Sequence, residues 1–425
     1  MKHVINLFLM DISHAANTSG VDRHISTLIG GLQNFNHICV HWIHFTDEAS
    51  LLFPVEEVTA HYIKISIPLP QYYNTIIAER FWIRRYNEQV FRLTRHLFER
   101  KSNCIIHLHT LNLIDLAVYM REREQCKVIT HLHCIPWKAL YNKDKKRFNK
   151  LYELTYTNTG QTEKATPEMY VTNNCELQSY SEPDALICGT FCGIEFLKNC
   201  IGNFTNNTYV IPNGGDDYSN GHPRVYDKGK DESFSLLFVA TVNESKGVFF
   251  ILQTLKIIHN KGYKISLIIA GKCSPNLKKR IEFSYPNLNI TMLGLVSIEK
   301  LRELYSQSDI GIIGSLQEQA SYTGVEMSMF GMPIVTTNVD GLDEMFTDEM
   351  NALKVPTIFS PVLGLSIDVK IMVNQVIRLI NDPIIRKRIG KNARRLYEEK
   401  LTSTLMVKRI VYVYEEILNK ELKKI

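Results

Sequence analysis

The sequence has little that would assign it to a special class of protein. Nowhere do about 18 apolar residues follow one another, so no transmembrane helix is expected. The nine cysteines are an odd number and include no CxxC pair. The nearest cluster, Cys188, Cys192 and Cys200, lacks the spacing of a zinc site. We therefore expect reduced thiols and a cytoplasmic protein.

Glycine, proline and net charge are also low. Only 22 glycines and 14 prolines occur among 425 residues, and 45% of the residues are hydrophobic, which is typical of a globular protein with large cores. The formal net charge of +5 is too small to require nucleic acid as a partner. Because one hydrophobic core stops growing at roughly 250–300 residues, the length predicts two domains.

The N-terminus, MKHVINLFLM, is similar to a signal peptide in having a basic residue before a short apolar run. Asn6 interrupts this run, however, and a buried strand of a parallel sheet has the same pattern. We favour the strand, with a secretory signal as the alternative.

Apolar strand-like runs alternate with segments of helical spacing in both halves of the chain. This alternation is typical of βαβ units around a parallel sheet. The first half predicts strands at 4–10, 38–45, 104–108 and 127–131, and helices at 22–32 and 78–100. The second half predicts strands at 235–240, 264–270, 289–293, 310–314 and 333–337, and helices at 247–260, 298–306 and 323–330. The predicted fold class is α/β, with two doubly wound, Rossmann-like domains.

The segment between the halves is polar and has no periodicity. Residues 216–232 are rich in Asp, Gly and Lys, which is typical of a linker between domains. We place the N-terminal domain at 1–215 and the C-terminal domain at 233–400. Parallel sheets bind ligands at the carboxyl ends of their strands, so two such domains are expected to hold a ligand in a deep cleft between them.

Two glutamates eight residues apart mark the segment with the clearest chemistry. Glu318 lies on a loop after a predicted strand, and Glu326 lies in the first turn of the predicted helix that follows. Both carboxylates can therefore accept hydrogen bonds from the hydroxyls of one ligand. The helix begins at Tyr322, Thr323 and Gly324, where backbone N–H groups and the helix dipole suit a diphosphate.

This E-x7-E spacing resembles the signature of retaining glycosyltransferases of family 4, which belong to the glycosyl transferases group 1 and have the GT-B fold. The run EQASYTGVEMSMFGMPIV, followed by GLDEMF, resembles a bacterial subgroup of these enzymes. The resemblance extends over the whole chain and implies two facing domains. It also implies that Glu318 lies against the donor sugar, as a catalytic residue, and that Glu326 binds the ribose hydroxyls of the donor.

Three further positions resemble donor-binding residues of the family. Gly20, after the first strand, matches a glycine loop over the donor phosphates, although only one glycine stands where two are common. Lys246 matches a lysine that reaches the diphosphate. Thr241 stands where the family has an arginine, which removes a cation and its bidentate contact. Either donor affinity is lower, or Arg23 or Lys272 compensates.

The resemblance also assigns a second catalytic residue. His133, just past a predicted strand, matches a histidine that the family places near the transferred sugar. His131 is a weaker candidate, and His107 and His109 either line the same cleft or are structural. Gly294 is expected near the base and ribose of the donor, where backbone groups make the contacts.

No metal or cofactor is expected at the site. The sequence has no clear DxD motif for a divalent cation, and it has no HExxH motif or P-loop. The charge of the leaving group is therefore expected to be stabilised by Lys246 and backbone amides. The expected function is a retaining, metal-independent transfer of a hexose from a nucleotide-diphosphate sugar, UDP- or GDP-linked, to an acceptor hydroxyl.

The sequence leaves three classes of acceptor open: a surface glycan, a lipid-linked glycan and a peptide. Two basic segments, 78–101 and 138–150, predict either solvated helix faces or peripheral contact with anionic lipid at the inner face of the membrane. Two other functions remain as alternatives. One is a nucleotide-sugar epimerase of the same fold, and the other is a non-catalytic two-domain sugar-binding protein.

The last apolar segment, 401–422, has the spacing of an amphipathic helix. In the family such a helix crosses from the second domain back to the first, so residues 401–425 are expected to pack on the N-terminal domain. A helix packed wholly within the second domain is the alternative.

Overall fold

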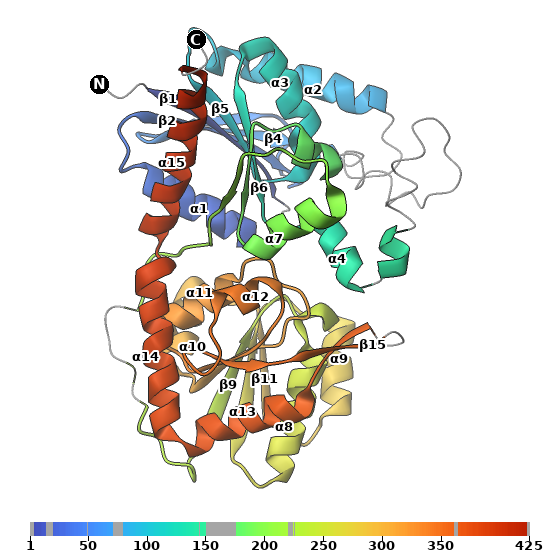
Figure 1. Cartoon of the computed structure of the whole chain (residues 1–425), viewed down its shortest axis with the longest axis vertical. Coiled ribbons are helices and arrows are strands. Elements are labelled where there is room, and N and C mark those ends of the chain that lie inside the picture. The colour runs from blue at the N-terminus through green and yellow to red at the C-terminus, as the bar shows by residue number, and fades with distance from the viewer. Residues whose placement is uncertain are drawn as a thin grey trace. The chain divides into compact units, whose positions relative to one another are not determined.

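A computed structural model gives the positions of most of the chain. It describes residues 4–13, 20–48, 50–70, 80–143, 145–149, 176–219, 224, 226–360 and 364–422. The chain divides into two compact units, Met1–Ile211 with Met406–Ile425, and Pro212–Leu405. We call these the first unit and the second unit, and their elements are labelled in Figure 1.

The first unit is built on a parallel sheet with one antiparallel edge. Its strand order is β3-β4-β2-β1-β5-β6-β7-β8. At the edge, β3 pairs antiparallel with β4, whereas β1 pairs parallel with both β2 and β5. The strands are β1 (Ile5–Ser13), β2 (Ile38–Thr46), β3 (Val55–Val58), β4 (Tyr62–Pro68), β5 (Cys104–Leu108), β6 (Lys127–Leu132), β7 (Ala185–Cys188) and β8 (Thr208–Val210).

Alternate residues of β1 face two separate hydrophobic clusters, because helices cover both faces of this sheet (Figure 1). Leu7 and Leu9 pack with α1 and α15, whereas Phe8 and Met10 pack with α2 and α3. The helices of the first unit are α1 (Gly20–Leu32), α2 (Arg80–Thr94), α3 (Ile114–Glu124), α4 (Pro136–Lys143), α7 (Phe191–Phe196) and α15 (Ser403–Leu422).

Helix α15 completes the core of the first unit from the far end of the sequence. The cluster that holds α1 and β1 also contains buried residues of α15, namely Met406, Val407, Ile410, Val411, Val413, Tyr414 and Ile417. Gly31 of α1 permits this packing, since a Cβ there would lie 2.5 Å from Cγ2 of Val407. Only the first three residues of α15 belong to the second unit.

The second unit has a six-stranded parallel sheet with the order β11-β10-β9-β12-β13-β14, and a separate hairpin, β15-β16. This order reverses direction at β9, which is where doubly wound sheets bind ligands. The strands are β9 (Phe234–Val239), β10 (Ile265–Ala270), β11 (Ile290–Gly294), β12 (Ile310–Ile313), β13 (Ile334–Thr337), β14 (Leu353–Val355), β15 (Thr357–Ser360) and β16 (Gly364–Ile367).

Helices also cover both faces of this second sheet. Leu236 and Phe238 of β9 pack with α8 and α13, whereas Leu237 packs with α10, α11 and α14. The helices are α8 (Val248–Asn260), α9 (Pro275–Ser284), α10 (Ile298–Gln307), α11 (Tyr322–Met329), α12 (Asp340–Met345), α13 (Val369–Asn381) and α14 (Pro383–Lys400).

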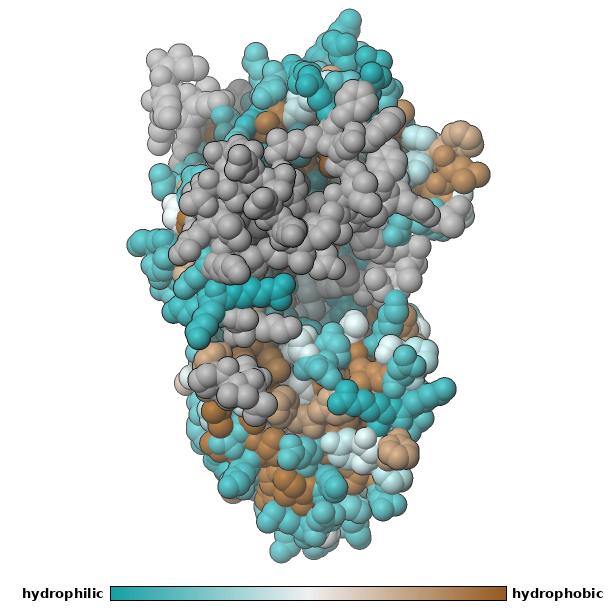
Figure 2. All heavy atoms as spheres, turned by 90° about the vertical axis from the view of Figure 1, so that its right-hand side faces the viewer, coloured by the Kyte–Doolittle hydropathy of each residue, from teal (hydrophilic) through white to brown (hydrophobic). Residues whose placement is uncertain are grey.

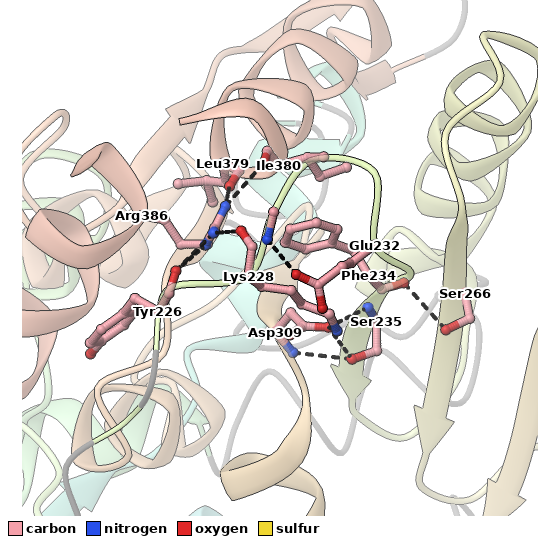
Figure 3. Close-up of polar contacts among 11 residues, drawn as sticks. Tyr226, Lys228, Glu232, Phe234, Ser235, Ser266, Asp309, Leu379, Ile380 and Arg386 are labelled. Atoms are coloured by element: carbon pink, nitrogen blue, oxygen red, sulfur yellow. Dashed lines mark hydrogen bonds and ion pairs between the residues drawn. The ribbon is translucent and has the colours of Figure 1, made fainter. Parts of the chain in front are cut away.

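A buried arginine joins the segment before β9 to α13 and α14 (Figure 3). The Arg386 side chain is 2% exposed. Its guanidinium donates hydrogen bonds to the carbonyl oxygens of Tyr226, Lys228, Leu379 and Ile380. These acceptors matter because a buried guanidinium without partners would strongly destabilise the fold. Lys228 in turn pairs with Asp309, with 2.9 Å between Nζ and Oδ2.

The segment predicted as a linker belongs to the second unit where it is described. Besides the contacts of residues 226–228 with Arg386, Asp217 pairs with Arg394 of α14 at 2.5 Å. The polar residues that suggested a linker therefore make specific contacts with this unit. Residues 220–223 and 225 lie outside the described residues.

The predicted strands are confirmed, each with bounds within three residues of the structure. The predicted helices are confirmed as closely, except that the segment predicted as a helix at 78–100 is helical from Arg80 to Thr94 and continues as a 3-10 turn to Leu97. The strands β3, β4, β7, β8, β14 and the β15-β16 hairpin, which are short or lie towards the sheet edges, were not predicted from the sequence.

The described residues contain no helix with the length and hydropathy needed to cross a membrane. On the face drawn in Figure 2, hydrophobic residues occur in patches among hydrophilic ones. In the first basic segment, Arg84 and Arg92 of α2 are exposed and Phe91 is buried, as on an amphipathic helix. In the second, Lys138 is buried, and its Nζ lies 3.1 Å from Sγ of Cys192.

The packing of α15 predicts that a core truncation on this helix destabilises the first unit. Ile410 is fully buried, so Ile410→Ala should lower the free energy of unfolding by about 2–5 kcal/mol. The matched control is Tyr412→Ala, because Tyr412 is 61% exposed on the same helix and should change stability by about 0.5 kcal/mol or less. Denaturant unfolding followed by circular dichroism measures both. Equal effects of the two substitutions would contradict the packing of α15.

Candidate active site

Glycines with positive φ mark the carboxyl edge of the second sheet. Gly247, Gly271 and Gly294, which lie at or after the ends of β9, β10 and β11, have φ of 71°, 136° and 69°. Other residues rarely adopt these values. At Gly271 a Cβ would also lie 1.9 Å from the carbonyl oxygen of Ala240. The edge where such sheets bind ligands is therefore formed by closely packed backbone.

The loops after β9 and β12 contact each other through their backbones. A Cβ on Gly247 would lie 1.8 Å from the carbonyl oxygen of Gly314, so only glycine fits there. The amide of Leu316 donates a hydrogen bond to the carbonyl oxygen of Ser245 at 2.8 Å. These contacts hold Lys246, on the first loop, against the second loop.

Glu318 is bound from three directions. Its Oε2 accepts hydrogen bonds from Nζ of Lys246 at 2.6 Å and from Oγ of Ser315 at 3.1 Å. Its carbonyl oxygen accepts a hydrogen bond from the amide of Gly341 at 2.8 Å. The Lys246 and Glu318 side chains are 28% and 15% exposed, so water screens the ion pair only in part. The structure thus brings together two residues that the sequence placed at the site.

Glu326 is held by a residue that the sequence did not indicate. Oη of Tyr305 donates a hydrogen bond to Oε2 of Glu326 at 2.5 Å, and the Tyr305 ring is buried and stacked on Phe330. The sequence predicted Glu326 in the first turn of this helix. Because the helix begins at Tyr322, Glu326 lies in the second turn instead. A lone tyrosine on an amphipathic helix carries no sequence signal for such a role.

The start of α11 is partly used by the protein itself. Oγ of Ser321 accepts a hydrogen bond from the amide of Gly324 at 3.0 Å, so this predicted donor to a phosphate already has an acceptor. Oγ1 of Thr323 donates to the carbonyl oxygen of Val239, which ties α11 to β9. Gly324 must also be small, since a Cβ there would lie 2.7 Å from Sδ of Met345.

Thr241, which stands in place of the expected arginine, is exposed on the loop after β9. On the same loop, Oδ1 of Asn243 accepts a hydrogen bond from the amide of Lys246 at 3.0 Å, which fixes the turn that presents the lysine. The nearby Arg280 pairs with Glu244 at 3.0 Å on the exposed surface. The ammonium of Lys246 is therefore the cation that this loop directs towards Glu318.

In the first unit, Gly20 is the first residue of α1 and is exposed. Residues 14–19, which form the rest of the predicted glycine loop, lie outside the described residues.

Histidines gather at the carboxyl ends of β5 and β6. Nε2 of His133 lies 3.0 Å from Nδ1 of His109, and the His133 ring stacks on His131 with 4.4 Å between centroids. His24 of α1 lies against both strand ends, with its centroid 4.4 Å from that of His131. The sequence singled out the other three but not His24, although helical spacing places it on the buried face of α1. His107 contacts Oη of Tyr414 instead, at 2.7 Å.

Burial lowers the pKa of the imidazoles at these two strand ends. It lowers the pKa of His107 to about 3, with a smaller contribution from the neighbouring His24. Burial also lowers the pKa of His109 and of His131 well below the ordinary value, and the surrounding histidines add to the effect. A neutral imidazole offers a nitrogen lone pair at neutral pH, either to a proton or to a metal ion.

A buried carboxyl group anchors the segment after His133. Glu176 accepts a hydrogen bond from the amide of Trp137 at 3.0 Å and another from Oη of Tyr180. Burial raises the pKa of Glu176 to about 8, although both hydrogen bonds lower it. The carboxyl group is therefore largely protonated at neutral pH, and it holds the start of α4 in place.

Residues 227–396 match the family model of the glycosyl transferases group 1. The capsular polysaccharide biosynthesis glycosyltransferase CapM of Staphylococcus aureus is 24% identical over 195 residues, which is 45% of this chain and 49% of that protein. The alpha-D-kanosaminyltransferase of Streptomyces kanamyceticus is 24% identical over 191 residues, 44% of this chain and 47% of that protein. The chain thus spans about half the length of these curated relatives.

Solved structures match nearly the whole chain. Sucrose-phosphate synthase from Thermosynechococcus elongatus has a TM-score of 0.72 at 16% identity, over 98% of this chain and 100% of that one. HepE from Anabaena, in complex with UDP and glucose, has a TM-score of 0.65 at 13% identity, over 97% of this chain and 100% of that one. The fold is GT-B. Together with the family match, it supports a glycosyltransferase of group 1.

The contact between the two loops predicts that adding one methyl group at Gly247 strongly destabilises the second unit. Gly247→Ala would place Cβ against the Gly314 carbonyl, so it should lower the free energy of unfolding by more than about 4 kcal/mol. The control is Gly262→Ala, since Gly262 also has positive φ but its Cβ would meet nothing within 4 Å. Gly262→Ala should lower the free energy of unfolding by only about 1–2 kcal/mol. Calorimetric unfolding measures both, and similar losses would contradict the role of the close approach.

Proposed function

We propose that this protein is a retaining glycosyltransferase of family 4. It transfers a hexose from a nucleotide-diphosphate sugar to an acceptor hydroxyl, without a metal ion on the diphosphate. Glu318 and His133 are the proposed catalytic residues. The proposed donor-binding residues are Gly20, Thr241, Lys246, Gly294, Tyr322, Thr323, Gly324 and Glu326.

The contact between Lys246 and Glu318 carries this proposal. Without a donor, the ammonium group is neutralised by the carboxylate at 2.6 Å. A diphosphate offers the same ammonium a second anionic partner, so donor binding competes with Glu318 and releases its oxygen to accept a hydrogen bond from the sugar. When the bond from C1 to the phosphate oxygen breaks, its electrons stay on the diphosphate, and Lys246 offsets that charge. The acceptor oxygen bonds to C1, and its proton passes to the departing phosphate oxygen.

Similar proteins support the choice of donor and acceptor. Structures of Anabaena HepE contain UDP or UDP-glucose, which favours a UDP-linked donor over a GDP-linked one. The relative from Staphylococcus aureus is named for capsular polysaccharide biosynthesis, which favours a surface glycan over a lipid-linked glycan or a peptide. No disulfide joins the cysteines among the described residues, in keeping with a bacterial cytoplasmic enzyme, peripheral at the inner face of the membrane.

The reaction can be tested directly by nucleotide release. Full-length protein incubated with UDP- and GDP-sugars should release nucleotide only when a surface-polysaccharide fragment is present, and the product should keep the anomeric configuration of the donor by NMR. Release should persist after EDTA and be unchanged by Mg²⁺ or Mn²⁺, because Lys246 occupies the position of a hard cation.

Each other result has a definite meaning. Nucleotide release without an acceptor, together with an altered free sugar, would establish the epimerase. Binding without release would establish a sugar-binding protein. Activity that EDTA abolishes and that only Mg²⁺ or Mn²⁺ restores would refute transfer without a metal on the diphosphate.

The two glutamates should separate donor binding from turnover. Glu326→Gln removes an anionic acceptor of the ribose hydroxyls and should weaken UDP binding by about 10-fold or more. Glu318→Gln should slow turnover by about 10²-fold, because contacts to the sugar strengthen as it departs. UDP affinity of Glu318→Gln should be equal or higher, since Lys246 loses its competing partner.

Calorimetry with UDP and turnover of the preferred donor measure these effects. Glu282→Gln is the control, because Glu282 is exposed on α9 of the same unit. Weaker UDP binding in Glu318→Gln than in Glu326→Gln would reverse the two assignments.

A further inference from the structure

The first unit contains a group of histidines larger than the proposed transfer requires. His133 alone has a proposed role in that reaction, yet three further imidazoles lie around it. We call the group the histidine cluster: His24, His109, His131 and His133. His24, His109 and His131 are buried and His133 is half-buried. They come from α1 and from the ends of β5 and β6, so three separate elements bring their side chains together.

The spacing of the four rings is that of ligands around one ion. The candidate nitrogen atoms all lie within 4.8 Å of one another. A metal ion bonded to imidazole at about 2.0–2.1 Å lies about 3.1 Å from the ring centroid, so four tetrahedral imidazoles have centroids about 5.1 Å apart. The six centroid separations in the cluster range from 4.4 to 5.4 Å.

Hydrogen bonding within the protein leaves lone pairs or N–H groups of the cluster unused. His109 bonds to His133 through Nδ1, but its buried Nε2 has no hydrogen-bond partner among the described residues. Nδ1 of His131 is also buried and has no hydrogen-bond partner in the part of the chain that the structure describes. Each such buried polar atom without a partner destabilises the fold. A cation that accepts imidazole lone pairs would recover part of this cost.

We propose that the histidine cluster binds one divalent transition-metal ion, of the class that includes Zn²⁺ and Co²⁺. Imidazole nitrogen suits these ions, whereas Ca²⁺ and Mg²⁺ prefer oxygen ligands, and the cluster contains no carboxylate. The half-buried His133 provides the solvent side from which the ion enters.

Metal binding requires side-chain rotations, because the rings of His109, His131 and His133 are all stacked on one another, with 5° to 24° between their planes. The rings of His131 and His133 are nearly parallel, with 5° between their planes, and two stacked rings cannot both direct a nitrogen at one ion. Rotation of the half-buried His133 ring about its side-chain bonds removes its stacking and breaks its contact with His109. The contact that is lost is a single hydrogen bond of 3.0 Å, and metal–nitrogen bonds replace it.

Metal binding to the full-length protein tests this inference. After dialysis against EDTA, the protein is titrated with ZnCl2 in a calorimeter and with CoCl2 in a spectrophotometer. We expect one Zn²⁺ per chain, and the visible absorption of tetrahedral Co²⁺, displaced by Zn²⁺. His133→Gln and His109→Gln should lower Zn²⁺ affinity by at least about 10²-fold, since loss of even an outer-shell partner costs 10–100-fold. His61→Gln is the control, because His61 is exposed in the same unit.

The outcomes are separable from those of the transfer reaction. If buried His109→Gln fails to fold by circular dichroism, the half-exposed His133→Gln carries the test. The inference is overturned if the wild type shows no tetrahedral Co²⁺ spectrum, or if His133→Gln binds Zn²⁺ as tightly as the wild type. UDP affinity is measured on the same samples. A protein that binds Zn²⁺ but not UDP keeps this inference and loses the proposed function, and the reverse result does the opposite.

Discussion

The approach of the Gly247 backbone to the Gly314 carbonyl is the constraint on which the candidate site depends. Because no side chain separates the two loops there, Lys246 reaches Glu318 and the backbone of Ser245 bonds to that of Leu316. A third strand also holds the loop after β12, because Oγ1 of Thr337 on β13 donates a hydrogen bond to the carbonyl oxygen of Ser315 at 2.6 Å. The charged groups therefore sit on backbone fixed from three neighbouring strands, which limits the reorganisation that a reaction would require.

The carboxyl edges of the two sheets differ in the kind of polar group that they present. In the second unit each candidate carboxylate has a donor, Lys246 for Glu318 and Tyr305 for Glu326. In the first unit burial lowers the pKa of His109, His131 and His133, and the histidine cluster contains no carboxylate, so we propose that it binds through lone pairs and not through charge. One edge is thus suited to anionic ligands and the other to groups that accept electron pairs.

Periodicity was enough to predict β1, β2, β5 and β6 of the first sheet and β9 to β13 of the second, because strands buried on both faces are continuous apolar runs. The family resemblance placed Lys246 and Glu318 at one site, but their direct contact was found only in the structure. The capped amide of Gly324 could have been predicted, since Ser321 stands three residues before it, as N-cap residues do. Tyr305, His24 and Arg386 could not, because their roles arise from packing between segments distant in sequence, which no local pattern records.

The return of α15 to the first unit has a consequence for folding during synthesis. Residues 212–405 have all their strands and helices once that stretch has left the ribosome, so this unit can fold while translation continues. The first unit, although begun earlier, lacks Met406 to Ile417 of its core until that segment has also been made. Until then the faces of β1 and α1 that α15 covers stay open to solvent, and this intermediate is the form in which a chaperone would find exposed apolar surface.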